Sequence, residues 1–295
     1  MRKTILAASL ATAAFAVPQL ALAQAAAPAA APAPTPDYTV TGNVGVFSSY
    51  RFRGIAQTYD EPAIQGGLDF SHVSGFYVGN WDSNVNQGAG YPGGNIEMDF
   101  YGGWKKSWGD WGIDLGGIYY YYPGTNSGPT IGFSPANNRT GVVHTGRVDN
   151  GELYIAGSWK FISLKYSHAV TDYFSTPNTK NSNYIDLSAN YDLGDGWGIN
   201  GHVGHLNFKN MTNGSYTDWK LGVTKDLGGW IGGMAGWVVA VSYIDTDAKG
   251  DCGNTTSPQP YCFSNGNTNT ANPSGFDKTK DASKGIGVIS ISKTF

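Results

Sequence analysis

Histidine, serine and aspartate are the side chains in this sequence that could carry hydrolytic chemistry. Ser167 and His168 are neighbours, but adjacent residues of a β-strand point to opposite faces, so one strand cannot pair them as nucleophile and base. His144 has Asp149 close by in a long connecting segment, and an outer-membrane barrel enzyme would place such residues at its rim. The sequence contains no nucleophile elbow, phosphate-binding loop or spaced metal cluster. Solvated histidines fit this distribution better than a catalytic site, and we therefore predict no enzyme activity, cofactor or metal.

A second set of ionisable side chains recurs at alternate positions of otherwise apolar segments. Period-two alternation puts these side chains on one face of a strand and the apolar ones on the other. An ionisable residue within a membrane domain must face water or a partner, so we expect this set to line a lumen. The predicted lumen charges are seven acids and four bases: Asp69, Glu97, Asp99, Asp114, Glu152, Asp186, Asp218, Arg51, Arg53, Lys165 and Lys220. The excess of acids favours a mild preference for cations.

Strands are the elements that must position these charges. The alternation predicts twelve strands, with ten or fourteen as alternatives; they lie within 38–52, 64–70, 76–81, 96–104, 111–121, 153–159, 162–166, 185–193, 197–203, 219–223, 239–243 and 287–295. Short turns are expected at 72–75, 107–110, 160, 194–196 and, somewhat longer, 228–236. Long polar connections are expected at 55–61, 82–95, 123–150, 170–182, 209–215 and 246–283. This alternation of short periplasmic turns and long external loops is typical of outer-membrane barrels.

Four consecutive tyrosines, Tyr119 to Tyr122, end the fifth of these strands. If that strand rises from Trp111 at the periplasmic rim, the four rings arrive near the external interface. Tyr119 and Tyr121 would then face lipid, where a phenol ring suits the boundary between acyl chains and headgroups. Tyr120 and Tyr122 would line the lumen, where their hydroxyls meet water or the inward charges.

The composition agrees with a transmembrane β-barrel. The chain holds 42 glycines and 14% aromatic residues but only 14% charged residues, whereas soluble domains carry about 25%. A soluble β-sandwich is the rival fold because it also alternates apolar and polar residues, but a sandwich does not require every second connection to be long. The formal charge of −3 argues against a nucleic-acid partner.

The N-terminal region resembles an export signal followed by a linker. Arg2 and Lys3 precede an apolar run, and Ala21-Leu22-Ala23 supplies the small residues that a signal peptidase reads. We predict a signal peptide at 1–23, an Ala/Pro-rich linker at 24–37 and the barrel at 38–295, with an N-terminal membrane anchor as the alternative for the first segment.

The cysteines and the last strand add two further predictions. Export makes a disulfide between Cys252 and Cys262 plausible, with two free thiols as the alternative. The chain ends on Phe295, preceded in register by Ile289 and Ile291, which is the pattern that bacterial outer-membrane barrels present to their insertion machinery. Lys293 departs from that pattern, because an aromatic or aliphatic residue is more usual at its position.

Four stretches carry a resemblance to a known family: "VFSSYRFRGIAQT" from Val46, "GFYVGNWDSNV" from Gly75, "IEMDFYGGW" from Ile96 and "GIYYYYPG" from Gly117. In this order they resemble the TorF-type porins of Gram-negative bacteria, a family of conserved hypothetical outer-membrane proteins. The resemblance covers about 38–295, although 246–283 looks peculiar to this chain. It implies an outer-membrane barrel and a channel, and it brings neither a substrate nor catalytic residues.

We therefore expect a porin-like channel for passive diffusion of small solutes or ions across the Gram-negative outer membrane. Its expected partners are outer-membrane lipid, the barrel-insertion machinery and the diffusing solutes. Eight strands leave an interior filled by side chains and sixteen leave an aqueous channel, so twelve strands favour a narrow passage. The connection 123–150 could fold inward and constrict it. A closed structural barrel is the first alternative, and a barrel enzyme that uses loop His and Asp residues is the second.

Overall fold

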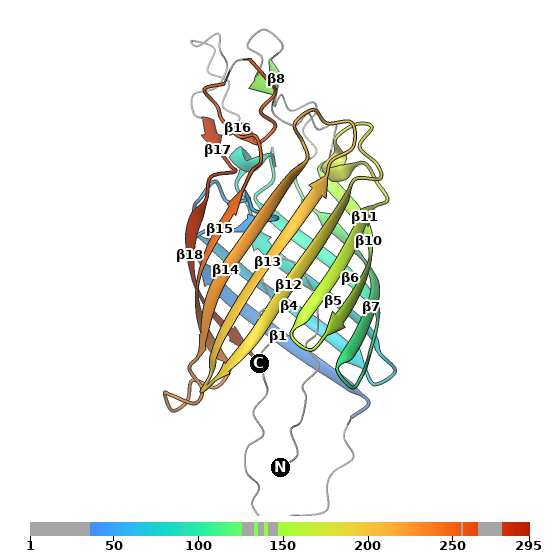
Figure 1. Ribbon diagram of the computed structural model, residues 1–295, viewed down its shortest axis with the longest axis vertical. Coiled ribbons are helices and arrows are strands. Elements are labelled where there is room, and N and C mark those ends of the chain that lie inside the picture. The colour runs from blue at the N-terminus through green and yellow to red at the C-terminus, as the bar shows by residue number, and fades with distance from the viewer. Residues whose placement is uncertain are drawn as a thin grey trace, which may run out of the picture.

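The computed structural model describes residues 36–91, 93–125, 133–134, 139–140, 147–254, 256–264 and 279–295. The predicted signal peptide, nearly all of the predicted linker and His144 lie outside these residues. Within them, twelve antiparallel strands close into a barrel (Figure 1), in the order β1-β18-β15-β14-β13-β12-β11-β10-β7-β6-β5-β4. The prediction of an all-β antiparallel barrel with twelve strands is confirmed.

The barrel strands follow the chain, each paired with its neighbours in sequence apart from the closing pair β1 and β18. Their bounds are β1 Tyr38–Phe47, β4 Ala63–His72, β5 Phe76–Asn84, β6 Ile96–Trp108, β7 Trp111–Tyr121, β10 Asp149–Trp159, β11 Ile162–Ala169, β12 Asn183–Gly194, β13 Trp197–Asn207, β14 Tyr216–Asp226, β15 Trp237–Thr246 and β18 Ile286–Thr294. Backbone hydrogen bonds between Gly42 and Phe295, at 2.8 and 2.9 Å, extend the closing seam to the end of the chain.

The connections differ between the two ends of the barrel. One end, which we call the short-turn end, carries the turns after β4, β6, β10, β12 and β14 together with residue 295 (Figure 1). The opposite, long-loop end carries the minor elements β2 Arg51–Phe52, β3 Ile55–Ala56, η1 Gln87–Ala89, β8 Phe133–Ser134, β9 Arg139–Thr140, η3 Tyr173–Ser175, β16 Cys262–Ser264 and β17 Thr279–Asp281. Among the described residues, no helix is long and apolar enough to cross a membrane.

The strands alternate between an apolar outer face and a polar inner face. On β7, Trp111 and Leu115 are exposed on the outside, whereas Asp114 and Tyr120 are buried inside. Aromatic rings gather on the outer face at both ends of the barrel. Trp111 and Trp159 lie 6.2 Å apart, between ring centroids, at the short-turn end, and Trp219 and Tyr243 lie 5.5 Å apart towards the long-loop end. The period-two pattern of the sequence is thus the pattern of a barrel wall with apolar surroundings.

The first strand is shorter than the alternation predicted. We expected it to run to residue 52, but β1 ends at Phe47. The ladder to β18 stops where the Ser48 backbone N–H donates to the Ile289 carbonyl and the Ser48 hydroxyl accepts from the Ile289 N–H. The chain then forms the separate hairpin of β2 and β3, whose turn places Arg53 and Gly54 at φ 48° and 81°. Glycine accommodates a positive φ without a steric penalty, which favours a reversal at this point.

Candidate functional site: the barrel lumen

The wall residues predicted to line the lumen all lie on the inner face. Eight of the charged side chains among them stand on seven strands: Asp69, Glu97, Asp99, Asp114, Glu152, Lys165, Asp186 and Asp218, of which all but Asp69 are buried. Lys220 stands on β14 directly opposite His202 of β13. Tyr120 and Tyr122 are each 1% exposed and also point inward. Arg51 and Arg53 are placed differently, because they belong to the β2–β3 hairpin and not to the wall.

Tyrosine hydroxyls satisfy many of the inward carboxylates. The Tyr101 hydroxyl donates to Asp69 at 2.6 Å, and the Tyr122 hydroxyl donates to Glu97 at 2.7 Å. Tyr77 donates to Asp114 at 2.6 Å and also shares a hydrogen bond with the hydroxyl of Tyr154. Hydrogen bonds to a charged acceptor are stronger than neutral ones, so these phenols hold the carboxylates against the wall. The inner surface is therefore ordered as well as polar.

Three features of the inner face were absent from the predicted list. Lys105 faces inward opposite Asp114, with its Nζ 5.0 Å from the centroid of the Tyr77 ring. Tyr77 escaped notice because the alternation of its strand is indistinct in the sequence. His202 faces two acids, with Nδ1 2.9 Å from Asp186 Oδ2 and Nε2 3.5 Å from an Asp218 oxygen. Its inward register was readable from the sequence, but its partners come from two other strands.

The turn of the β2–β3 hairpin lies against the inner face of the wall at the long-loop end, with Gly54 beside Asp218 of β14 and Arg53 beside Glu152 of β10. Tyr50, Arg51, Ile55 and Ala56 are all nearly inaccessible, with exposed fractions of 1%, 2%, 4% and 1%. The Ala56 backbone N–H donates to the carbonyl of Ala282, which joins the hairpin to the last loop. A loop tip would ordinarily be solvated, whereas this hairpin is buried at the long-loop end of the lumen.

Arg53 attaches the tip of the hairpin to the barrel wall. Its Nη1 and Nη2 reach the two carboxylate oxygens of Glu152 at 3.0 and 2.7 Å, and Nη1 also donates to the Tyr173 hydroxyl at 2.9 Å. The guanidinium carbon lies 4.3 Å from the centroid of the Tyr184 ring. Burial lowers the pKa of Arg53, but the Glu152 carboxylate together with the hydroxyls of Tyr173 and Tyr120 outweighs burial and raises it above its ordinary value. The guanidinium is therefore charged, and its fork geometry matches the carboxylate.

Tyr184 is held in place by a glycine on the next strand. A Cβ atom at Gly204 would lie 1.8 Å from the Tyr184 hydroxyl and 2.3 Å from Cζ, so the ring lies directly over the glycine. In this position the hydroxyl donates to Asp218 at 2.9 Å, and the ring face receives the Arg53 guanidinium. The glycine thus provides the space in which the hairpin is anchored.

Arg51 ties the base of the hairpin to the last loop. Its Nη1 donates to the Ala282 carbonyl at 2.8 Å, and its Nη2 lies 2.5 Å from Asp60 Oδ1. Asp60 also pairs with Lys280 through its second oxygen at 2.9 Å. Desolvation lowers the pKa of Arg51. The nearby carboxylates of Asp60, Asp281 and Asp245 offset this effect only in part. The two arginines of the hairpin therefore hold it from opposite sides.

Aromatic rings from several loops pack around the hairpin. Phe52 contacts Tyr120 and Phe174, with ring centroids 5.5 and 5.7 Å apart, and Tyr91 stacks on Tyr122 at 4.3 Å. Phe174 has φ 46° and ψ 47°, a left-handed conformation that turns its ring into this cluster. Offset and edge-to-face ring pairs add to the hydrophobic stabilisation of such a cluster. The described loops therefore fill the long-loop end of the lumen.

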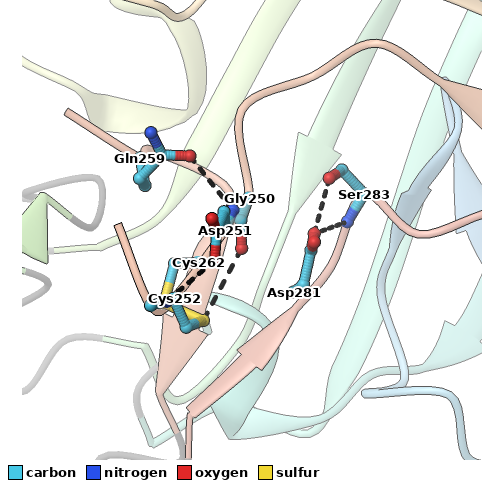
Figure 2. Close-up of a disulfide and its surroundings, with 8 residues drawn as sticks. Gly250, Asp251, Cys252, Gln259, Cys262, Asp281 and Ser283 are labelled. Carbon is cyan, nitrogen blue, oxygen red and sulfur yellow. Dashed lines mark hydrogen bonds between the residues drawn. A yellow bond between two sulfur atoms is a disulfide. The ribbon is translucent and has the colours of Figure 1, made fainter. Parts of the chain in front are cut away.

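The structure joins Cys252 and Cys262 in a disulfide, with their Cα atoms 5.1 Å apart (Figure 2). Gln259 accepts a hydrogen bond from the Asp251 backbone N–H at 3.0 Å, which closes the same segment. The cross-link lies beside the start of β16, so it fixes the position of the neighbouring Tyr261, which is 5% exposed. It therefore stabilises a part of the last loop that contacts the contents of the lumen.

The other two tyrosines of the run, Tyr119 and Tyr121, fall on the outer face. Tyr119 donates from its hydroxyl to Asp149 at 2.7 Å, and Tyr121 packs under Arg147 with 5.4 Å between guanidinium carbon and ring centroid. Ser167 is buried in the lumen, whereas His168 is half-buried and stacks on the exposed Tyr166 ring, so these neighbours do point to opposite faces. The pairing of His144 with Asp149 cannot be followed, because His144 lies outside the described residues, as does most of the connection 123–150.

The outward residues of the last strand are exposed. Ile289, Ile291 and Phe295 have exposed fractions of 64%, 39% and 69%. The ring of Phe295 lies over Gly42 of β1, where a Cβ atom would come within 2.6 Å of Phe295 Cε2. The last residue therefore covers the seam on the outside while its backbone closes it.

Residues 30–270 match a family described as "Bacterial protein of unknown function (Gcw_chp)". The chain belongs to this family. No curated protein is similar enough to count as a relative.

Among solved structures, the chain is similar to a KdgM porin, with 7% identity, a TM-score of 0.47 and coverage of 86% of this chain and 99% of that chain. The same KdgM porin in complex with disordered oligogalacturonate gives 6% identity, a TM-score of 0.46 and coverage of 87% and 99%.

The member described here is also similar to OmpT, an outer membrane protein of Vibrio cholerae. The identity is 12% and the TM-score 0.40, with coverage of 88% of this chain and 97% of that chain. Each of these likenesses concerns the course of the barrel backbone.

Proposed function

We propose that this protein is a narrow channel in the outer membrane of Gram-negative bacteria, of the TorF porin type, through which small solutes diffuse passively. The observation that carries the proposal is a closed barrel with an apolar outer face and an inner face of paired charges and phenols. Twelve of its strands have 8 to 13 residues, and a strand of about 9–11 residues crosses a bilayer. The short-turn end then faces the periplasm and the long-loop end faces outward.

The aromatic residues of the outer face support this placement. Tryptophan and tyrosine concentrate at the two membrane interfaces, where the ring is apolar and the polar edge is wet. Trp111 and Trp159 would form part of the periplasmic girdle, and Trp219 and Tyr243 part of the external one. Tyr119, whose hydroxyl meets Asp149, would stand at the external boundary as well.

The inward hairpin gives specific support to the runner-up, a closed structural barrel. The hairpin and the aromatic cluster fill the external end of the lumen. We infer that this conformation is the closed state of the channel and that conduction requires the hairpin to move. The test is conductance of the purified full-length protein in a planar bilayer. Single-channel current steps support the channel. If neither the wild-type protein nor a variant with a partly destabilised hairpin gives current steps, the result supports the structural barrel.

The inward charges predict a mild preference for cations. The inner acids listed above outnumber the inner bases even when Lys105 is counted with them. A lumen lined by an excess of one sign of charge raises the local concentration of the opposite counter-ion. The reversal potential in a KCl gradient should therefore have the sign of a cation-selective pore and should approach zero as the salt concentration rises. An anion-selective reversal potential would contradict this assignment of the lumen.

The last strand is proposed to direct the barrel to its insertion machinery. Phe295 and Ile291 face outward next to the seam, where another protein could bind them before closure. We expect Phe295→Ser to reduce the amount of folded barrel in the outer membrane several-fold. Phe161→Ser is the matched control, because Phe161 is also an exposed aromatic at the short-turn end. Heat-modifiable migration in gel electrophoresis measures the folded fraction, and an equal loss in both variants would reject a special role for the last residue.

A further inference from the structure

A small cavity remains inside the aromatic cluster at the long-loop end. Its volume is about 80 Å³, and its walls are mostly apolar. Its lining includes Phe52 and Ile55 of the hairpin, Phe174 of η3, and Phe208, Tyr216 and Tyr261. The cavity is partly open, so a ligand can reach it. Ligand sites are typically concave and mostly apolar with a few polar groups, which is the character of this cavity.

One polar atom at the cavity is left without a partner. Thr176 lines the cavity, is 3% exposed, and its hydroxyl has no hydrogen-bond partner among the described residues. Two other polar side chains of the wall, Gln57 and Tyr261, are occupied. Gln57 accepts from the Tyr91 hydroxyl and donates to the Ile55 carbonyl, and the Tyr261 hydroxyl donates to the Gly214 carbonyl. A buried polar group without a partner is rare in a folded protein and marks the position of an absent partner.

We propose that this cavity binds a small, mostly apolar molecule that carries one hydroxyl group, such as phenol or cyclopentanol. Aromatic walls attract a ring through offset and edge-to-face contacts, and the Thr176 hydroxyl can donate to or accept from the single polar group. The cavity has about half the volume of an engineered, enclosed cavity that binds benzene, but it is partly open, so a single ring can occupy it with one edge in the opening. The inference rests on the proposed channel and names the class of ligand that its closed external mouth binds.

The same geometry argues against sugars at this position. A sugar carries several hydroxyl groups, and each must keep a hydrogen bond when it leaves water. In the described part of the chain, the Thr176 hydroxyl is the one buried polar group of the cavity wall without a hydrogen-bond partner, whereas Gln57 and Tyr261 are already engaged. A site built in this way rejects a ligand whose polar groups it cannot satisfy.

The test uses the full-length barrel in lipid nanodiscs and fluorine NMR of 4-fluorophenol. Empty nanodiscs provide the background, because phenols also enter lipid. We expect saturable line broadening above this background, which phenol and cyclopentanol abolish by competition and glucose leaves unchanged. Broadening equal to that of empty nanodiscs, or equal competition by glucose, would overturn the proposal. Competition in the wild-type protein needs no variant, so the test does not depend on a substitution that folds.

Two variants locate the site. Ala89, which is 3% exposed, lines the cavity, so Ala89→Leu should fill it and abolish saturable broadening. Thr176→Val keeps the shape and removes the hydroxyl; it should weaken 4-fluorophenol binding about fivefold, the usual effect of one hydrogen bond. Fluorobenzene, which lacks the hydroxyl, should bind equally to Thr176→Val and to the wild-type protein. Unchanged 4-fluorophenol binding in the folded Ala89→Leu protein would exclude this cavity.

Failure of this inference can be separated from failure of the proposed function. Conductance without saturable 4-fluorophenol binding would reject the site and leave the channel standing. Binding without conductance in the wild-type protein or in hairpin variants would reject the channel and make the barrel a binding protein.

Discussion

Replacing Arg53 with methionine is expected to destabilise the barrel by about 3–5 kcal/mol, because the buried Glu152 carboxylate would lose its ion pair. The hairpin would then leave the lumen, since the same substitution removes the hydrogen bond to Tyr173 and the contact with the Tyr184 ring. Limited proteolysis with chymotrypsin should reveal this as new cleavage at Tyr50 or Phe52, which are protected in the closed structure. The unfolding midpoint in denaturant measures the loss of stability.

Two further variants separate the ion pair from charge removal in general. Arg147→Met removes an arginine whose side chain is half exposed and whose partner Asp149 is partly exposed, so little or no loss is expected. The double variant Arg53→Met, Glu152→Gln removes the uncompensated charge and should recover much of the stability while the hairpin remains loose. A double variant as unstable as Arg53→Met alone would contradict the argument that an unpaired buried carboxylate is the cause.

Replacing Gly204 with alanine is expected to cost about 1–3 kcal/mol, because the new methyl group would collide with the Tyr184 ring. The ring would have to move, and its movement would disturb the hydrogen bond to Asp218 and the contact between the ring and the Arg53 guanidinium. The unfolding midpoint of the purified barrel measures the cost. Chymotrypsin cleavage in the hairpin should also rise, although less than in Arg53→Met.

Gly157→Ala is the matched control for this substitution. Gly157 stands on barrel strand β10 with nothing within 4 Å of an added Cβ, so its replacement should leave the stability nearly unchanged. Equal effects at the two glycines would show that backbone flexibility, and not the position of Tyr184, determines the loss.

The barrel itself could be predicted from the sequence because the patterns that specify its strands lie within short segments of the chain. Apolar and polar residues alternate along each strand, as in Trp111, Ile113 and Leu115 against Asp114, and every second connection is long. These two patterns define the strands, the inner face and the two ends. The inward positions of Glu97 and Asp186 follow from register alone, since a slip of one residue would expose them on the apolar face.

The closure of the lumen could not be predicted in this way. Residues 48–53 continue the alternation of β1, so the sequence favoured a longer strand. The hairpin forms because Arg53 pairs with Glu152, 99 residues away, and Arg51 donates a hydrogen bond to the Ala282 carbonyl, 231 residues away. No local pattern encodes such pairs. The turn residues Arg53-Gly54 were the one available indication, because glycine often marks a reversal.

The partners of the inward charges were equally hidden. His202 was readable as an inward residue, but Asp186 and Asp218 reach it from the strands on either side of its own. The tyrosines that bind Asp69 and Asp114 also come from other strands. Register between strands decides these pairs, and a single sequence gives the register only approximately.

The most direct test of the central claim is a single-channel recording of the wild-type protein beside the Arg53→Met, Glu152→Gln variant in the same planar bilayer. A narrow channel closed by the hairpin predicts small or brief steps for the wild-type protein and a larger, steady conductance for the double variant, with Arg147→Met behaving as the wild type. Silence in both proteins would contradict the channel, and identical steps in both would contradict closure by the hairpin.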